Sequence, residues 1–169
     1  MTRSTTSSGR RYLTIALLAS AGLMAFAPQA AFAYDEKSTS AINVDSKGVA
    51  VNGYDVVAYF TAAQPTQGQA ALHAGYNGAT YWFSSAANRD AFKKNPAHFV
   101  PQFGGFCAMG VALDKKLDGD PTAWRIVDDK LYLNVNKDVQ KKWLEDVPGN
   151  LAKAGQSWPV IKNKAPQAL

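Results

Sequence analysis

The side chains most able to do chemistry in this sequence are few. Beyond residue 33 the chain holds one cysteine, Cys107, one methionine, Met109, and two histidines, His73 and His98. Thiolate and thioether groups are soft ligands that favour Cu(I) over hard cations, and imidazole also binds copper. In an extended segment the side chains of Cys107 and Met109 would lie on the same face, whereas in a helix they would diverge. These four residues are the candidate ligands of a soft metal ion.

The same residues support a second hypothesis, which is thiol chemistry. Cys107 would be the nucleophile, and His98, nine residues upstream, would be its general base. Because the chain has no other cysteine, a redox cycle would need a thiol from a partner or would stop at a sulfenic acid. A third hypothesis assigns Cys107 and Met109 to packing, since buried cysteines are common and usually inert. The residues alone leave all three hypotheses open.

The first 33 residues have the pattern of a secretory signal peptide. They contain Arg3, Arg10 and Arg11 but no acidic residue, then an apolar run at 13–26 and a small-x-small site ending at Ala33. We expect cleavage after Ala33 and a periplasmic or secreted product, by either the Sec or the twin-arginine route. The apolar run is shorter than the roughly 20 residues of a membrane span. No stable membrane insertion is expected after the signal peptide is removed.

The basic composition does not indicate nucleic-acid binding. The chain has 18 basic and 13 acidic residues, a net charge of +5, but three of the bases lie in the predicted signal peptide. The exported chain then has a net charge of +2. Its lysine doublets at 93–94, 115–116 and 141–142 are isolated, and no glycine-rich phosphate-binding motif is present. We therefore expect no nucleic-acid partner, and a metal ion or another protein is the expected partner.

The exported sequence is organised as one domain between two polar ends. Residues 34–41 are an expected flexible N-terminus, residues 42–160 the domain, and residues 161–169 a flexible tail. The first part of the domain predicts three features: a tight hairpin at 42–51, a short helix at 55–60 capped by Asp55, and a surface loop at 61–68.

The clearest local signal is Asn77-Gly78 between aromatic and β-branched residues, which predicts a hairpin over 71–83. Ser84 or Ser85 would cap a following helix at 86–94, which Pro96 ends. The later features are a buried, uncharged, glycine-rich segment at 100–112, a second hairpin at 124–134, and helices at 137–146 and 148–156 before Trp158-Pro159. The pattern predicts an α+β fold: a single small domain of β-hairpins packed with short helices, without repeats.

Four motifs along the chain together indicate a family. They are Gly53-Tyr54-Asp55-Val56-Val57-Ala58-Tyr59-Phe60, Tyr81-Trp82-Phe83-Ser84-Ser85 with Asn88 and Phe92, Asn95-Pro96, and Pro101-Gln102-Phe103-Gly104-Gly105-Phe106-Cys107-Ala108. These motifs resemble the YHS-domain family, and the similarity looks close to its exported bacterial members. It extends through residues 124–134 and the Trp143 helix to Trp158-Pro159, and so covers nearly the whole exported chain.

The resemblance implies metal binding, with copper as the expected ion, because short YHS domains occur in copper-transporting ATPases and related metal-handling proteins. In those relatives cysteines accompany the Tyr-x-Phe-x-Ser stretch and the helix after it, whereas residues 81–88 here hold no thiol. The remaining thiol is Cys107, and in some exported relatives a selenocysteine can stand at this position, which implies soft-metal or redox chemistry.

We therefore expect a binding protein more than an enzyme. Its metal site would combine Cys107, Met109, His98 and His73 in an apolar pocket lined by Phe103 and Phe106. The alternatives are a thiol redox protein that uses Cys107, with His98 as its base, and a structural or interaction domain in which Cys107 is buried.

Overall fold

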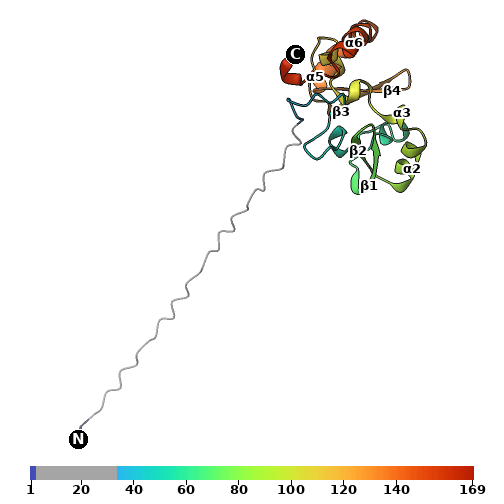
Figure 1. Cartoon of the computed structure of the whole chain (residues 1–169). Helices are drawn as coiled ribbons and strands as arrows, with labels where there is room; N and C mark the ends of the chain where they lie inside the picture. The colour runs from blue at the N-terminus through green and yellow to red at the C-terminus, as the bar shows by residue number, and fades with distance from the viewer. Residues whose placement is uncertain (3–33) are drawn as a thin grey trace. The chain divides into compact units, whose positions relative to one another are not determined.

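The computed structural model describes residues 1–2 and 34–169. The predicted signal peptide, its cleavage after Ala33 and its export route lie outside the described residues. From residue 34 onward the chain has the expected α+β fold, in which two antiparallel two-stranded sheets are surrounded by short helices (Figure 1). The strands are β1 (Gln69–Tyr76), β2 (Ala79–Phe83), β3 (Asp120–Val127) and β4 (Lys130–Asn134). The α-helices are α1 (Ala58–Thr61), α2 (Ala86–Lys94), α3 (Pro96–Phe99), α4 (Ala108–Val111), α5 (Lys137–Leu144) and α6 (Val147–Ile161). Single 3-10 turns are η1 (Val51–Gly53), η2 (Gln102–Gly105) and η3 (Pro166–Ala168).

The first sheet is the hairpin expected around Asn77 and Gly78. Both residues have positive φ, +49° and +82°, which is the backbone of the tight turn that Asn-Gly favours because glycine has no Cβ to clash. Tyr81 and Phe83 are buried in β2, and Phe92 of α2 packs against both rings with centroids 5.0 Å away. This packing holds α2 on the hairpin.

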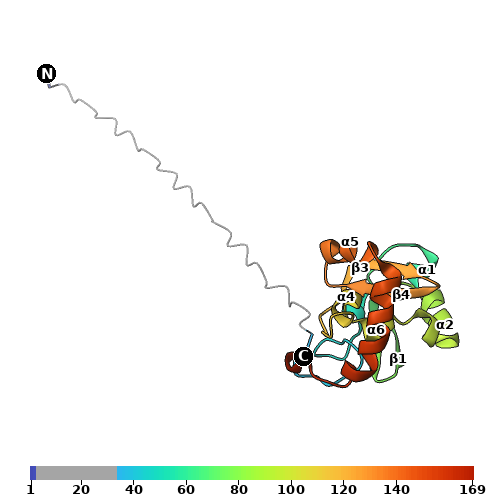
Figure 2. The same ribbon diagram turned by 90° about the horizontal axis from the view of Figure 1, so that it is seen from above.

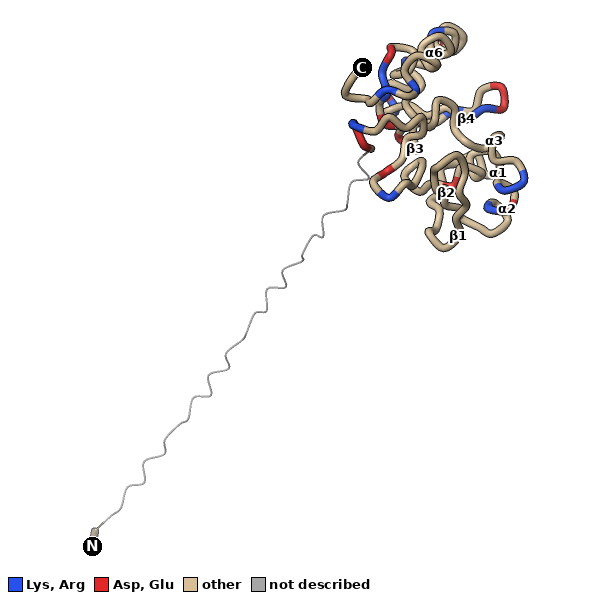
Figure 3. The backbone as a smooth tube through the Cα atoms, viewed as in Figure 1, with Lys and Arg blue, Asp and Glu red and all other residues tan. Residues whose placement is uncertain are grey.

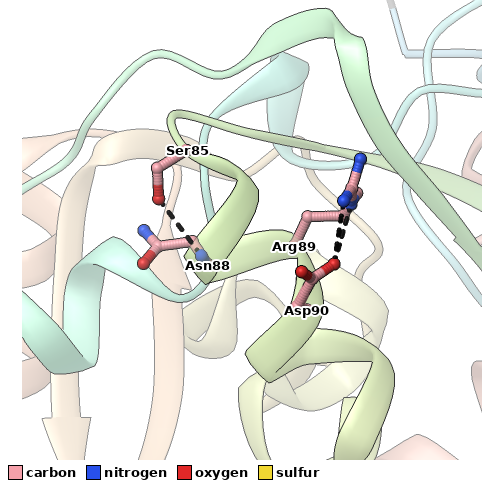
Figure 4. Close-up of polar contacts among 4 residues, drawn as sticks. All are labelled: Ser85, Asn88, Arg89 and Asp90. Carbon is pink, nitrogen blue, oxygen red and sulfur yellow. Dashed lines mark hydrogen bonds and ion pairs between the residues drawn. The ribbon is translucent and has the colours of Figure 1, made fainter.

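Helix α2 begins where the sequence predicts. The Ser85 side chain accepts a hydrogen bond from the backbone N–H of Asn88 at 3.1 Å, which satisfies one free donor of the first turn (Figure 4). The next residue, Arg89, pairs with Asp90 at 2.9 Å on the solvent side of the same helix (Figure 4). Ser85 is therefore the cap, of the two serines expected.

The second sheet is the hairpin expected around residues 128–130. Asp128 and Asp129 form its turn with φ of +48° and +59°. Leu131 and Leu133 of β4 are fully buried and pack into the same core as the first hairpin. Helix α5 follows, and the side chain of its cap Asn136 accepts a hydrogen bond from the N–H of Val139 at 2.9 Å.

The two hairpin–helix units are equivalent at an offset of 51 residues. Each has an eight-residue strand, a two-residue turn, a five-residue strand and a capped helix. The register shifts at the same place in each: the flanking pairs are Gln69–Phe83 and His73–Trp82 in the first unit, and Asp120–Asn134 and Trp124–Leu133 in the second. The expectation of a fold without repeats is therefore wrong for the structure. Across residues 69–94, only Tyr81 has an identical counterpart, Tyr132, so the sequence hides the repeat.

Helix α6 packs against α4 beside the second sheet (Figure 2). The expected helix at 148–156 is longer in the structure, because α6 continues through Pro159 to Ile161. A proline inside a helix frees the carbonyl four residues earlier. Here that carbonyl belongs to Gly155, which is exposed to water like Pro159, while Ala154 and Ile161 stay buried on the opposite face. Packing of that face outweighs the lost hydrogen bond.

Three smaller expectations are adjusted by the structure. The hairpin at 42–51 is a turn closed by one bridge, between Val44 and Ala50, without regular strands. Asp55 does bind the N–H groups of Val57 and Ala58, at 2.9 and 3.3 Å, but the helix it precedes is only the four-residue α1. Pro96 ends α2 and also begins α3, since proline needs no N–H partner in a first helical turn.

The first and last segments of residues 34–169 contact the domain through Lys116. Its side chain is 1% exposed, and Nζ donates to the carbonyl oxygens of Ser40, Lys162 and Lys164 at 2.7, 3.0 and 2.8 Å. Nζ also lies 4.7 Å from the centre of the Phe106 ring. Burial lowers the pKa of Lys116 to about 8. The segments expected to be flexible, 34–41 and 161–169, thus share one buried cation.

The other charges are distributed over the helices and turns, with both signs interspersed (Figure 3). None of the helices in the described part of the chain is long and apolar enough to cross a membrane.

Candidate functional site

Cys107 lies where the glycine-rich segment enters α4. The segment packs closely because Gly104, with φ of +62°, abuts the Ala41 carbonyl and leaves no space for a side chain. The N–H of Cys107 donates to the carbonyl of Leu117 at 2.9 Å, and Cys107 also bridges to Leu133 of β4. The Cys107 side chain is 0% exposed. The burial expected for this segment is confirmed.

The Cys107 sulfur faces backbone N–H groups. Cys107 is the residue before the first turn of α4, and the N–H of Gly110 donates to its Sγ at 3.3 Å. The N–H groups of Met109 and Val135 also lie close enough to the sulfur to lower the pKa of the thiol. Burial raises the pKa of the Cys107 thiol, and the three N–H groups oppose that rise. The thiol is therefore neutral at neutral pH, in a setting with donors for an anionic sulfur.

Asn134 is the side chain that touches this sulfur from β4. It is fully buried, its Oδ1 lies 3.8 Å from Cys107 Sγ, and the same oxygen accepts the N–H of Met109 at 3.3 Å. Its Nδ2 has no hydrogen-bond partner among the described residues. A buried amide left half unpaired costs free energy, and Asn134 therefore has unused donors on the same amide group whose Oδ1 contacts the thiol.

Cys107 and Met109 line one pocket between α4, the chain after it and α5. The pocket has a volume of about 470 Å³, and its remaining lining residues are Gly110, Leu113, Leu117, Val135, Asp138, Val139 and Lys142. Leu113 is 61% exposed at its rim. Asp138 and Lys142 contribute one charge of each sign from neighbouring turns of α5. The walls are otherwise apolar.

The structure brings Cys107 and Met109 together although Met109 is helical. Cys107 has a non-helical backbone, with φ of −57° and ψ of 117°, because it precedes α4, whereas Met109 lies inside the first turn. The two side chains therefore leave the backbone from different local geometries and reach the same pocket. The expectation considered Cys107 and Met109 either both in an extended segment or both in a helix. In the structure Cys107 is the cap and Met109 is helical.

The expected lining by Phe103 and Phe106 is wrong. Phe103 packs against Tyr132 and Trp158, and Phe106 packs against Trp158 and beneath Lys116. Neither lines the pocket of Cys107. The reversal of the backbone at η2 turns these rings toward α6, and leucines and valines take their place.

The two histidines lie at other places in the fold. His98 of α3 packs against Phe60 and Phe99, with its Nδ1 3.3 Å from a carboxylate oxygen of Asp129. His73 of β1 is paired through Nδ1 with the carbonyl of Ala70 at 2.8 Å. Neither lines the Cys107 pocket. Within the described residues, no group of three or more His, Cys, Asp and Glu side chains is arranged to hold a metal ion.

Sequence reasoning missed Asn134, Val135, Asp138 and Lys142. One signal for Asn134 is present in the sequence, because Leu131, Tyr132 and Leu133 directly before it are apolar or aromatic on both faces of the strand. An asparagine that ends such a strand must be buried, and a buried amide needs partners. The other three residues carry no such signal, since they become neighbours of Cys107 only through the packing of α5.

Comparison with family models, with curated proteins and with solved structures found no match to this chain.

Proposed function

We propose that this chain is an exported soft-metal-binding protein of the YHS type, in which Cys107 and Met109 hold Cu(I). The observation that carries the proposal is that the thiol and the thioether of residues 34–169 line the same apolar pocket. Soft sulfur ligands select Cu(I), and apolar walls disfavour strongly hydrated hard cations. The family resemblance, which implies copper, supports the same ion.

The ligand set favours copper over zinc. A structural zinc site needs four protein ligands, whereas two or three suffice for Cu(I). The pocket offers two sulfur groups, with Asp138 as its one carboxylate. His73 and His98 lie elsewhere and are left out of the proposed set.

Cys107 must lose its proton to bind the ion. Burial raises the pKa of this thiol, so the proton competes with the metal, and affinity falls as the pH falls. The N–H groups of Met109, Gly110 and Val135 partly compensate the thiolate charge before and after the ion arrives. The role of the protein is to hold this sulfur in fixed geometry away from other thiols.

The test is a Cu(I) titration of the exported chain against a competing chromophoric chelator under reducing, oxygen-free conditions. We expect binding of one ion, at least a hundredfold weaker in Cys107→Ser and about tenfold weaker in Met109→Leu. His98→Gln and His73→Gln are matched controls, because they remove ligands of the same general class outside the pocket. Their affinities should equal that of the unmodified protein.

Unchanged affinity in Cys107→Ser would overturn the proposal. Loss of affinity in His98→Gln would place the copper site at α3 and would also overturn the proposal. A Cys107→Ser protein that lost stability while the unmodified protein bound no copper would assign Cys107 to packing. Thermal unfolding of each variant, measured without metal, separates these outcomes.

A further inference from the structure

In the repeat, Cys107 is equivalent to a buried carboxylate residue, Asp55. Upstream of the first hairpin–helix unit, Asp55 lies two residues before Val57, the cap of α1, and its N–H donates to the carbonyl of Thr66 at 2.8 Å. Upstream of the second unit, Cys107 is itself the cap of α4, and its N–H donates to the carbonyl of Leu117 at 2.9 Å. The offsets are 52 and 51 residues, and both side chains are 0% exposed. Cys107 thus occupies the place that Asp55 occupies in the other half of the domain.

Asp55 is surrounded by hydrogen-bond donors. Its Oδ1 accepts the N–H groups of Val57 and Ala58 at 2.9 and 3.3 Å. Its Oδ2 accepts three bonds, from the N–H and Oγ–H of Ser84 at 2.8 and 2.6 Å, and from Nδ2 of Asn88 at 2.7 Å. A two-oxygen anion fills this site, and no cation is needed to hold it.

The donors around Cys107 correspond to those of Asp55. Met109 and Gly110 stand where Val57 and Ala58 stand, and Val135 stands where Ser84 stands. The N–H groups of all three act on the sulfur. Three backbone N–H groups therefore surround the single sulfur atom of Cys107. The three equivalent N–H groups around Asp55 bind two carboxylate oxygens.

One buried donor near Cys107 is unused. In place of the Ser84 hydroxyl and the Asn88 amide, the second unit has the apolar side chains of Val135 and Val139. The polar side chain near the sulfur is instead Asn134. Its Oδ1 contacts the sulfur, and its Nδ2 has no partner in the described chain. A thiol leaves this amide half paired, whereas an acceptor with two oxygens would have a donor available there.

We infer that Cys107 is a site of oxidation by hydroperoxides, and that the surrounding N–H groups with Asn134 retain the sulfinate product. A sulfinate has two oxygens on the atom bonded to Cβ, as the carboxylate of aspartate does, so it reproduces the shape and charge of Asp55 in the equivalent position. This inference does not depend on metal binding.

The reaction takes two equivalents of hydrogen peroxide. In the first step the thiolate sulfur attacks one peroxide oxygen, the O–O bond breaks, and the released hydroxide takes up a proton to form water; the sulfur becomes a sulfenic acid. In the second step the sulfenate sulfur attacks another peroxide in the same way, forming a second S–O bond and a second water. The sulfur loses two electrons in each step. Since the chain has no second cysteine, the sulfenic acid has no resolving thiol within the molecule.

Access to the sulfur comes from the pocket. Cys107 is 0% exposed but lines the cavity of about 470 Å³, so peroxide reaches the sulfur through this cavity once its lining side chains are displaced. The raised pKa keeps the thiolate population low, so oxidation is slow at neutral pH.

The first experiment treats the metal-free exported chain with hydrogen peroxide and follows the mass of the peptide that contains Cys107. Met109→Leu is used as background, because methionine also takes up oxygen. We expect Cys107 to gain two oxygen atoms and to stop there in the folded protein, but to gain three in the unfolded protein. A free thiol after prolonged treatment, or a third oxygen in the folded protein, overturns the inference.

The second experiment needs no oxidant. Cys107→Asp introduces the carboxylate that a sulfinate would imitate, and Cys107→Asn is its uncharged isosteric control. If the site holds an anion, the aspartate variant unfolds at a higher temperature than the asparagine variant at pH 7. The reverse order, or an aspartate variant that does not fold while the asparagine variant does, contradicts the inference. Neither experiment uses copper, so failure here leaves the proposed function to be judged by its own titration.

Discussion

Replacing Lys116 by methionine should destabilise the domain strongly, although Lys116 pairs with no acidic side chain among the described residues. Methionine keeps an apolar stem beside Phe106 but removes the three N–H donors that bind Ser40, Lys162 and Lys164 at 2.7 to 3.0 Å. Each such bond contributes roughly 1 kcal/mol net, so the free energy of unfolding should fall by about 3 kcal/mol. For a domain of this size the midpoint of thermal unfolding should fall by about 10 °C.

Lys116 also predicts a pH dependence. The ordinary pKa of 10.5 applies to the unfolded chain, while burial lowers the pKa in the folded protein to about 8. Between these values the unfolded chain binds more protons than the folded protein, so the contribution of Lys116 to stability rises with pH. The slope is at most about 1.4 kcal/mol per pH unit. Below about pH 8 both states are protonated and this dependence disappears.

The assay is chemical denaturation of residues 34–169 and of their Lys116→Met variant from pH 7 to 10.5. Lys115→Met is the matched control, because it removes an adjacent lysine that is exposed to solvent. The difference between the unmodified protein and Lys116→Met should widen above pH 8, and Lys115→Met should follow the unmodified protein. Equal losses in the two variants, or parallel pH profiles throughout, would refute the assignment of Lys116 as a buried cation that holds both ends of the chain.

Three further predictions concern the repeated hairpin–helix units. Asp55→Asn places amide hydrogens against the five donors around this side chain and should cost about 3 kcal/mol in urea denaturation; a loss under 1 kcal/mol would contradict its role as a buried anion. Asp129→Gly should raise the free energy of unfolding by roughly 0.5–1 kcal/mol, because φ is +59° at this position. Gly78→Ala at the equivalent turn should lower the free energy of unfolding by a similar amount. A lower stability of Asp129→Gly would show that the contact of Asp129 with His98 matters more than the turn. Ser85→Ala should cost about 1 kcal/mol by thermal denaturation, with Ser85→Thr close to the unmodified protein, and equal losses in both would exclude the cap.

The elements that could be predicted are those specified by nearby residues. Asn77-Gly78 specifies its turn through positive φ, and a serine at 84 or 85 specifies the start of α2 through one hydrogen bond, so both features could be predicted without tertiary information; the structure assigns the cap to Ser85. The end of α6 was not, because Pro159 is a local stop signal and the packing of Ala154 and Ile161 overrides it. The repeat was hidden because equivalent residues share a backbone but not a side-chain type.

The candidate site shows the same division. Cys107 and Met109 stand out by residue type, and the burial of their segment follows from its glycines and lack of charge. The directions of Phe103 and Phe106 depend on the backbone reversal at η2, where Phe103 itself has φ of +53°. Asn134 reaches the sulfur from 27 residues away through the pairing of β4. Contacts of this kind are tertiary, so no local pattern could predict them.

The most direct test of the proposed soft-metal binding is the copper X-ray absorption spectrum of residues 34–169 loaded with Cu(I). The proposal predicts a first coordination shell that contains sulfur and no imidazole, and a shell with one sulfur fewer in Met109→Leu. A spectrum with imidazole scattering, or one that Cys107→Ser leaves unchanged, would contradict the assignment of Cys107 and Met109 as the copper ligands.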